Sequence, residues 1–274
     1  MFSKITRLAI TGAAIATMAF AASPVAAAND AMVRVLHASP DAPAVDVYVN
    51  GAKVGAPLAN LKFGDLSAYV ALPAGTYDLK VCAAADATIC PIVANGVALT
   101  AGTHYTIAAT NKLATIEAQI ITDAPAPVAD KTQVRVVHFS SDTPAVDVLT
   151  QDGAAKVVEN LAYPNATGYL TLDAGSYDLK VCANADNTVC PLDPGALDLA
   201  AGTSYSVFAI GSLTATPATL TAVVGVDAVA APATDTIESP AAVVTTSPVS
   251  VLLIGAALVS LLGAARLATR RVER

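Results

Sequence analysis

Residues 33–47 read VRVLHASPDAPAVDV, and residues 134–148 repeat them almost unchanged as VRVVHFSSDTPAVDV. A second block behaves in the same way, since AGTYDLKVC at 74–82 returns as AGSYDLKVC at 174–182. Self-similarity at a fixed period indicates repeated structural units. The offset between copies is 101 residues in the first block and 100 in the second, and a one-residue change in a connecting loop accounts for the difference. The chain therefore contains two copies of one small domain.

Both copies alternate apolar and polar residues with the period of a β-strand. Residues 45–49 lead into Asn50-Gly51, and the matching strand of the second copy leads into Asp152-Gly153. These dipeptides favour the positive φ angles of a type I′ turn, which is a strong hairpin signal. Each copy offers about seven short strands in roughly 95 residues and no long helical pattern. We therefore predict an all-β fold of two tandem immunoglobulin-like β-sandwich domains.

Turns of the form Leu-x-Ala-Gly precede four tyrosines, Tyr77, Tyr105, Tyr177 and Tyr205. The pattern resembles the tyrosine corner of immunoglobulin-like sandwiches, in which a tyrosine hydroxyl bonds to the backbone a few residues upstream. The resemblance favours the same sandwich fold.

The N-terminal segment, residues 1–28, has the composition of a secretory signal peptide. Lys4 and Arg7 precede an uncharged stretch at 8–20, and the small residues 26–28 follow. A basic start, a short apolar core and a small-residue cleavage site are typical of export signals. The apolar core is too short to span a membrane, so we expect cleavage near residue 28.

The C-terminal segment predicts a membrane anchor. No charged residue occurs from 239 to 265, and arginines then cluster in the last nine residues. Membrane spans need about 20 apolar residues, and arginines prefer the cytoplasmic side. We expect a transmembrane helix at 249–265 and a basic cytoplasmic tail at 266–274, with the β domains outside the cell. In the alternative, the helix belongs to an envelope sorting signal and is removed, although no LPxTG-type motif precedes it.

Composition shifts divide the rest of the chain. The first β domain is expected at 29–123 and the second at 132–228. A stiff Pro/Ala linker joins them at 124–131, and a stalk rich in Ala, Pro and Thr follows at 229–248.

Charge excludes one class of partner. Residues 29–248 contain 9 basic and 21 acidic residues, which leaves a balance of −12. A surface this acidic repels phosphate backbones, so we expect no nucleic-acid partner.

Four cysteines occur at the same spacing in both copies: Cys82, Cys90, Cys182 and Cys190. An even number of cysteines in an exported chain indicates disulfides. Three pairings are open in principle, and sequence proximity favours Cys82–Cys90 and Cys182–Cys190. Redox catalysis and metal binding are disfavoured because neither a CxxC motif nor a neighbouring histidine is present.

One polar cluster occurs in each copy. It contains a histidine followed by two aspartates: His37, Asp41 and Asp46 in the first copy, and His138, Asp142 and Asp147 in the second. Such a set could bind a cation or ligand, or act in acid–base chemistry. It could also form a strand-end loop whose side chains hydrogen-bond to the local backbone, and we favour that structural interpretation.

The segment from Val33 to Gly51, together with Leu-Pro-Ala-Gly-Thr-Tyr at 72–77, resembles the bacterial family called domain of unknown function 4397, DUF4397. The resemblance covers both repeats, nearly all of residues 32–225. The second copy departs from the family pattern at Ser141 and Leu149, which implies a looser hairpin there. The resemblance implies an exported, surface-attached module and supplies no catalytic residues.

These observations together predict a non-enzymatic cell-surface protein that uses no cofactor. We expect an adhesion, envelope-binding or spacer role, with the membrane and either an envelope polymer or a surface protein as partners. The alternative is an extracytoplasmic ligand or cation sensor that uses the His–Asp loops.

Overall fold

The computed structural model describes residues 30–123 and 127–230 of the chain. The expected signal peptide, membrane helix and basic tail lie outside the described residues, as do nearly all of the stalk and part of the linker. No helix among the described residues is long and apolar enough to cross a membrane. All described residues belong to one compact unit.

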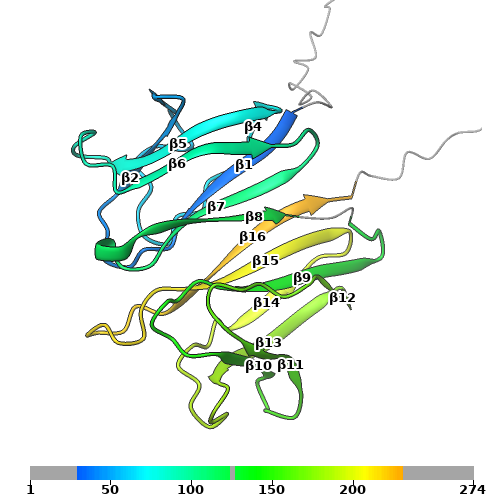
Figure 1. The fold of residues 1–274 in the computed structure, drawn as a ribbon. Coiled ribbons are helices and arrows are strands. Elements are labelled where there is room, and N and C mark those ends of the chain that lie inside the picture. The colour runs from blue at the N-terminus through cyan, green and yellow to red at the C-terminus, as the bar shows by residue number, and fades with distance from the viewer. Residues whose placement is uncertain (1–29, 124–126, 231–274) are drawn as a thin grey trace, which may run out of the picture. The chain divides into compact units, whose positions relative to one another are not determined.

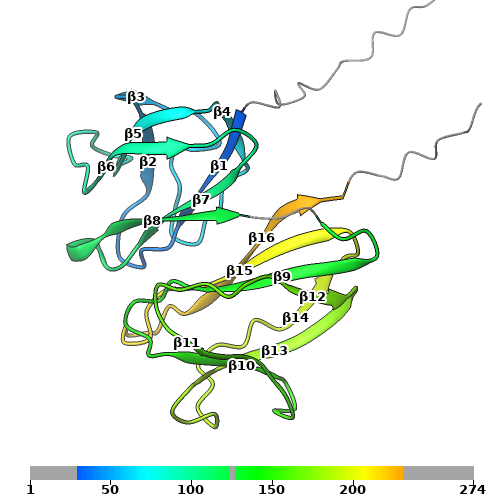
Figure 2. The ribbon, with the colours of Figure 1, turned by 45° about the vertical axis from the view of Figure 1, so that its right-hand side comes forward.

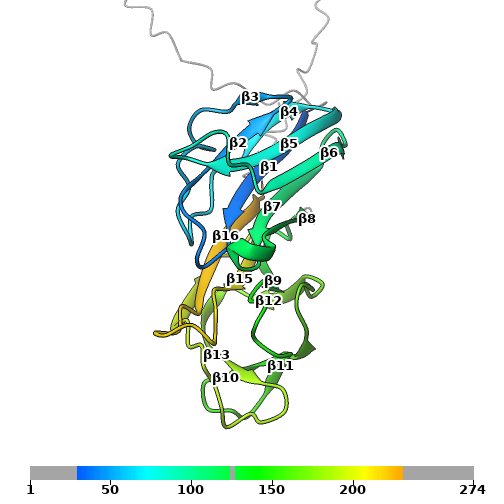
Figure 3. The ribbon, with the colours of Figure 1, turned by 60° about the vertical axis from the view of Figure 1, so that its left-hand side comes forward.

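The first repeat is a sandwich-like pair of four-stranded sheets (Figure 1). One sheet has the strand order β4-β1-β7-β8, and the other has the order β3-β2-β5-β6. Strand β1 pairs antiparallel with β4 and parallel with β7. The short 3-10 helix η1 (Leu113–Thr115) joins β7 to β8 (Figure 3). The strands are β1 (Asp30–His37), β2 (Val45–Val49), β3 (Ala52–Lys53), β4 (Val70–Pro73), β5 (Gly75–Ala83), β6 (Ile92–Leu99), β7 (His104–Thr110) and β8 (Glu117–Asp123).

The second repeat has the same topology. Figure 2 shows β9, β15 and β16 in one layer and β10, β11 and β13 in the other. The complete orders are β12-β9-β15-β16 and β11-β10-β13-β14, and β9 pairs parallel with β15. The all-β prediction is confirmed, with eight strands in each repeat rather than about seven. The strands are β9 (Lys131–His138), β10 (Val146–Thr150), β11 (Lys156–Leu161), β12 (Leu170–Asp173), β13 (Gly175–Ala183), β14 (Ala196–Leu199), β15 (Thr203–Ile210) and β16 (Thr221–Val229).

Strand β1 is buried on both of its faces. Val33 and Val35 enter the interior of the first sandwich, where they belong to its main apolar cluster. Arg34 and Leu36 point to the opposite face, and both are almost fully buried there. Because successive side chains of a strand alternate between faces, something must cover the outer face of this sheet as well.

A second apolar cluster, which contains residues of both repeats, provides that cover. Ala38 and Ala108 come from the first repeat, and Phe139 and Phe208 come from the second. The two phenylalanine rings stack with their centroids 6.1 Å apart. The alanines stand at the sequence positions that the phenylalanines occupy in the other repeat. Small side chains of one repeat therefore share a buried cluster with large side chains of the other.

The two predicted hairpin turns have different outcomes. Asn50 (φ 49°) and Gly51 (φ 81°) both have positive φ, so the type I′ turn of the first repeat is confirmed. In the second repeat Gly153 has positive φ but Asp152 does not, so that prediction is wrong. The second loop is longer, and the Asp152 carboxylate accepts a hydrogen bond from the Thr150 hydroxyl at 2.5 Å. This side-chain contact holds a wider loop than a two-residue turn.

The tyrosine contacts agree with the tyrosine-corner pattern. The Tyr77 hydroxyl donates to the carbonyl oxygen of Pro73, and the Tyr177 hydroxyl donates to that of Asp173, both at 2.7 Å. The hydroxyl of Tyr105 instead accepts a hydrogen bond from the backbone, five residues upstream. Each bond fixes the turn that precedes its strand.

Candidate functional site

The two candidate histidines are buried at the ends of β1 and β9. Nε2 of His37 donates to the carbonyl oxygen of Pro43 at 3.0 Å, and Nε2 of His138 donates to that of Pro144 at 3.2 Å. Nδ1 of His138 also accepts a hydrogen bond from the backbone N–H of Ser140. Burial lowers the pKa of both histidines, which favours the neutral ring that these contacts need. Each histidine thus anchors the loop that follows its strand.

The candidate aspartates of β2 and β10 each bind a lysine. Asp46 accepts from Nζ of Lys53 at 2.5 Å, and Asp147 accepts from Nζ of Lys156 at 2.7 Å. Burial alone would raise the pKa of Asp147, but hydrogen bonds from the N–H of Asn160 and from Lys156 outweigh it and hold that pKa well below its usual range. These carboxylates join a central strand to its neighbouring hairpin arm.

The remaining pair, Asp41 and Asp142, caps the loops that follow β7 and β15. Asp41 accepts a hydrogen bond from the backbone N–H of Leu113 at 2.7 Å. Asp142 accepts from the hydroxyls of Ser212 and Thr214, both at 2.5 Å. Burial opposes the ionised form of Asp142, yet these hydrogen bonds lower its pKa below the ordinary carboxyl range.

The His–Asp sets therefore do not come together as metal sites. Among residues 30–123 and 127–230, no three His, Cys, Asp or Glu side chains form a group that could hold a metal ion. Each of the six candidate residues instead hydrogen-bonds to a separate partner, which is a backbone group or a side chain of another residue. The arrangement does what the structural interpretation requires, because it fastens loops to strand ends.

All four cysteines form disulfides, and the pairings are Cys82–Cys90 and Cys182–Cys190. This outcome confirms the pairing that sequence proximity favoured. Disulfides persist in oxidising compartments, so the bonds support an extracytoplasmic location.

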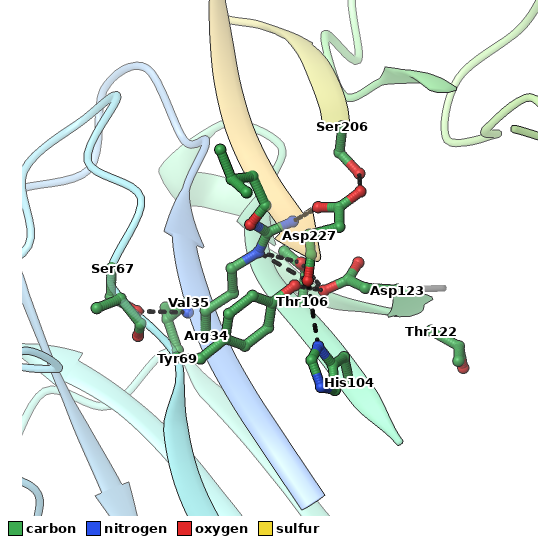
Figure 4. A network of polar contacts seen from close by, with 12 residues as sticks. Arg34, Val35, Ser67, Tyr69, His104, Thr106, Thr122, Asp123, Ser206 and Asp227 are labelled. Carbon is green, nitrogen blue, oxygen red and sulfur yellow. Dashed lines mark hydrogen bonds and ion pairs between the residues drawn. The ribbon is translucent and has the colours of Figure 1, made fainter. Parts of the chain in front are cut away.

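A buried polar network that joins the two repeats is the most elaborate polar feature of the described residues (Figure 4). Arg34 of β1 donates through Nε to the Thr106 hydroxyl at 2.8 Å and through Nη1 to the carbonyl oxygen of Val226 at 3.0 Å. Its Nη2 forms a short ion pair with Asp227 of β16. The side chains of Arg34 and Asp227 are 2% and 0% exposed, so this pair is removed from water.

The same contacts occur in reverse from the second repeat. Arg135 of β9 donates through Nε to the Ser206 hydroxyl at 2.7 Å, through Nη1 to the carbonyl oxygen of Thr122 at 2.9 Å, and through Nη2 to Asp123 of β8. The two hydroxyls close the network, because Thr106 donates to Asp123 and Ser206 donates to Asp227, both at 2.6 Å. Each arginine therefore binds a hydroxyl of its own repeat and a carboxylate of the other.

Two tyrosines complete this network. Tyr69 donates to Asp123, and Tyr169 donates to Asp227, both at 2.6 Å. The Arg34 guanidinium carbon lies 4.7 Å from the centre of the Tyr69 ring, within cation–π range. Burial, and then the nearby Asp123 carboxylate, raise the pKa of Tyr69 strongly, so the hydroxyl remains a donor at neutral pH. Arg34, Asp123, Arg135 and Asp227 form an ionic ring in which each guanidinium nitrogen and each carboxylate oxygen has at least one hydrogen-bond partner. Such pairing is the condition under which buried charges are tolerated.

Sequence reasoning did not single out the network. Asp123 stood at the predicted end of the first domain, but it is the final residue of β8 and is 3% exposed. One signal was available. An arginine stands between apolar residues of a predicted strand in both copies, at Arg34 and Arg135. A charge on a strand flanked by buried valines indicates a buried partner.

Comparisons with known proteins give a family and little more. The family described as "Domain of unknown function (DUF4397)" matches residues 31–149 and 149–238. No protein among those with curated functions matches the chain. Among solved structures, the Bacillus anthracis TIE protein is similar at 12% identity over 67% of this chain and 34% of that chain, with a TM-score of 0.21. The match spans about a third of that protein's length, and a likeness this low carries no argument. The family match extends over most of the chain, which therefore belongs to the DUF4397 family and carries two tandem copies of its domain.

Proposed function

We propose that this protein is a non-enzymatic cell-surface module in which two immunoglobulin-like sandwiches act as one rigid spacer or binding unit. The observation that carries the proposal is the reciprocal ionic ring of Arg34, Asp123, Arg135 and Asp227, because it ties the two repeats together. A structural role also accounts for the His–Asp loops, whose histidine and aspartate side chains hydrogen-bond to neighbouring loops and strands. The two disulfides suit a module that works in an oxidising environment.

The proposed location is the cell surface, with export by the N-terminal segment and anchoring by residues 249–265. The sequence patterns of both termini support this part of the proposal. The acidic balance of the β domains also suits solubility outside the membrane.

Surface labelling of cells that express the full chain tests the location. We expect external protease to cleave the β domains and a thiol reagent to label none of the four cysteines until a reductant is added. A chain that is protected from protease, or that has free thiols before reduction, would contradict the proposal.

Binding assays separate the two roles within the proposal. The full chain is offered purified envelope polymers and surface-protein extracts, and single-pass retention is measured with and without millimolar calcium. Calcium-independent retention by one polymer supports a binding module, and no retention supports a spacer. Turnover of an envelope glycan or peptide that a point substitution abolishes would overturn the non-enzymatic assignment.

A further inference from the structure

The interior of the second repeat is hollow. A cavity of about 150 Å³ lies between its two sheets, and every lining residue except Thr150 and Tyr177 is purely apolar. The lining comes from strands of both layers, with Val134 and Val207 from one sheet and Val148 and Val181 from the other. No charged side chain contributes to it.

The first repeat serves as an internal comparison, because its corresponding void is only about 20 Å³. Two side chains explain part of the difference. Leu58 is 2% exposed and fills the first interior, whereas the corresponding segment of the second repeat offers Val157 and Val158. Ile107 lines the small void, and the smaller Val207 stands at the same position in the large one. The smaller side chains of the second repeat thus account for part of its larger cavity.

The division of the apolar core supports the same conclusion. In the first repeat, Val81 and Leu99 belong to one continuous cluster. In the second repeat, the equivalent Val181 and Leu199 belong to two separate clusters, and both residues line the cavity. The cavity therefore occupies the space where the first repeat has continuous packing.

The edge strand beside the cavity is shorter than its counterpart in the first repeat. In the first repeat, Ala94 of β6 pairs with Leu79 of β5, which is buried. The corresponding residue of the second repeat is Pro194, which lacks a backbone N–H, and β14 begins only at Ala196. Leu179 is consequently part-exposed, and both Leu179 and Pro194 line the cavity.

We propose that this cavity binds a small uncharged hydrocarbon group of about six carbons, either a ring or the end of an alkyl chain. Apolar cavities of about 150 Å³ stay dry and bind molecules such as benzene or xenon. A guest restores the dispersion contacts that the lining lacks, whereas a polar guest would lose its hydrogen bonds to water without replacement. This inference is independent of the surface role proposed above.

Thermal unfolding of the full chain in lipid nanodiscs tests the site, with benzene as a free hydrocarbon and monomeric dihexanoylphosphatidylcholine as the source of an acyl-chain end. At a ligand concentration ten times the dissociation constant, we expect the single unfolding transition of the two repeats to rise by about 3–6 °C. A cavity-dependent shift with either ligand supports the proposal. The ligand that causes the shift shows whether the cavity takes a free hydrocarbon or the end of an acyl chain.

Two variants show whether the shift depends on the cavity. Val207→Ile adds the methylene that the first repeat has, so we expect it to reduce the shift at least threefold. Ile107→Val makes the reverse change in the first repeat and should leave the shift unchanged. Xenon-129 NMR of the unsubstituted chain provides a second readout, with a bound xenon signal that benzene displaces. No shift with either ligand, an equal shift in Val207→Ile, or no benzene-sensitive xenon signal would overturn the proposal.

Discussion

Arg34 and Arg135 are long charged side chains in the middle of apolar strands, and each is more than nine-tenths buried. Removing an ion from water costs several kcal/mol, and only a complete set of partners offsets that cost. Each arginine obtains its partners from two directions: a hydroxyl of its own repeat, and a carbonyl and a carboxylate of the other repeat. The three nitrogens of each guanidinium bond to three different acceptors in a fixed planar arrangement, which the single ammonium group of lysine cannot reproduce.

Removing one arginine should therefore destabilise the protein strongly. We expect Arg34→Met to lower the free energy of unfolding by about 3–5 kcal/mol, because it leaves the Asp227 carboxylate buried without its cation. Denaturant titration followed by circular dichroism measures the change. Lys131→Met is the matched control, since the Lys131–Asp173 pair is exposed to solvent and should matter little. Equal midpoints for the two variants would contradict the importance of the buried ring.

The buried histidines predict a pH dependence of stability. Burial lowers the folded-state pKa of His37 and His138 below the ordinary value of 6.5, so the unfolded chain binds more protons below that pH. Stability should therefore decrease as the pH falls through 6.5 and towards the lowered folded pKa. The lowered pKa of Asp147 adds stability above the ordinary carboxyl value of 3.8, and this contribution disappears only at lower pH.

The double variant His37→Gln/His138→Gln separates the two effects. Glutamine can donate to the same proline carbonyls but does not titrate. We expect the melting temperature of the variant to stay level between pH 6.5 and 5, where that of the parent protein declines. If the melting temperatures of the two proteins decline in parallel over this pH range, the histidines are not the cause of the decline.

At the scale of elements, turn chemistry decides how β2 continues into β3 and β10 into β11. Asn50 and Gly51 supply positive φ at both central positions, and the hairpin closes with two residues. The second repeat has a longer connection, and its hairpin pairs with an irregular register. Turn length and residue type thus set the register of otherwise similar strands.

A substitution at Gly51 tests the contribution of this backbone geometry. A side chain at this position would meet no atom within 4 Å, so the cost of Gly51→Ala comes from its φ of 81° alone. We expect a loss of about 1 kcal/mol in the free energy of unfolding. Gly55→Ala is the control, because Gly55 also has open space around it but no positive φ. The two variants are compared by their denaturant midpoints at equal slope, and equal midpoints would show that turn strain is negligible.

At the scale of the whole molecule, we expect the shared apolar cluster and the ionic ring to couple the unfolding of the two repeats. Gly225 of β16 is the most sensitive point of this contact. A Cβ atom there would lie 2.6 Å from Nη1 of Arg34 and 2.6 Å from Cδ2 of Leu66, both in the first repeat. Because Arg34 is held by several hydrogen bonds, it cannot move aside freely.

We expect Gly225→Ala to weaken the coupling between the repeats by about 1–3 kcal/mol, the usual cost of overpacking. In differential scanning calorimetry, the parent protein should unfold in one transition, and the variant should show two. Gly168→Ala is the control, since nothing lies within 4 Å of the added atom and its φ is ordinary. Two transitions in the parent protein would show that the repeats are not coupled.

Strand identity, the duplication and the disulfide pairing followed from the sequence, because each depends on local information. The alternation of Val45 and Val47 places them on one face, and the short spacing of Cys82 and Cys90 brings their sulfurs together. The interior of each repeat could be inferred for the same reason. The wider loop at Asp152 was the local exception, because a side-chain hydrogen bond replaced the expected turn.

The ionic ring and the cavity were decided only by the tertiary structure. Arg34 and Asp227 are 193 residues apart, and no periodicity relates them until both repeats have folded and met. The cavity depends on the sum of many side-chain volumes in two sheets, of which Val207 is one. Periodicity specifies which face of a strand is buried. It does not specify what covers that face or how completely the space is filled, because both depend on contacts between residues far apart in the chain.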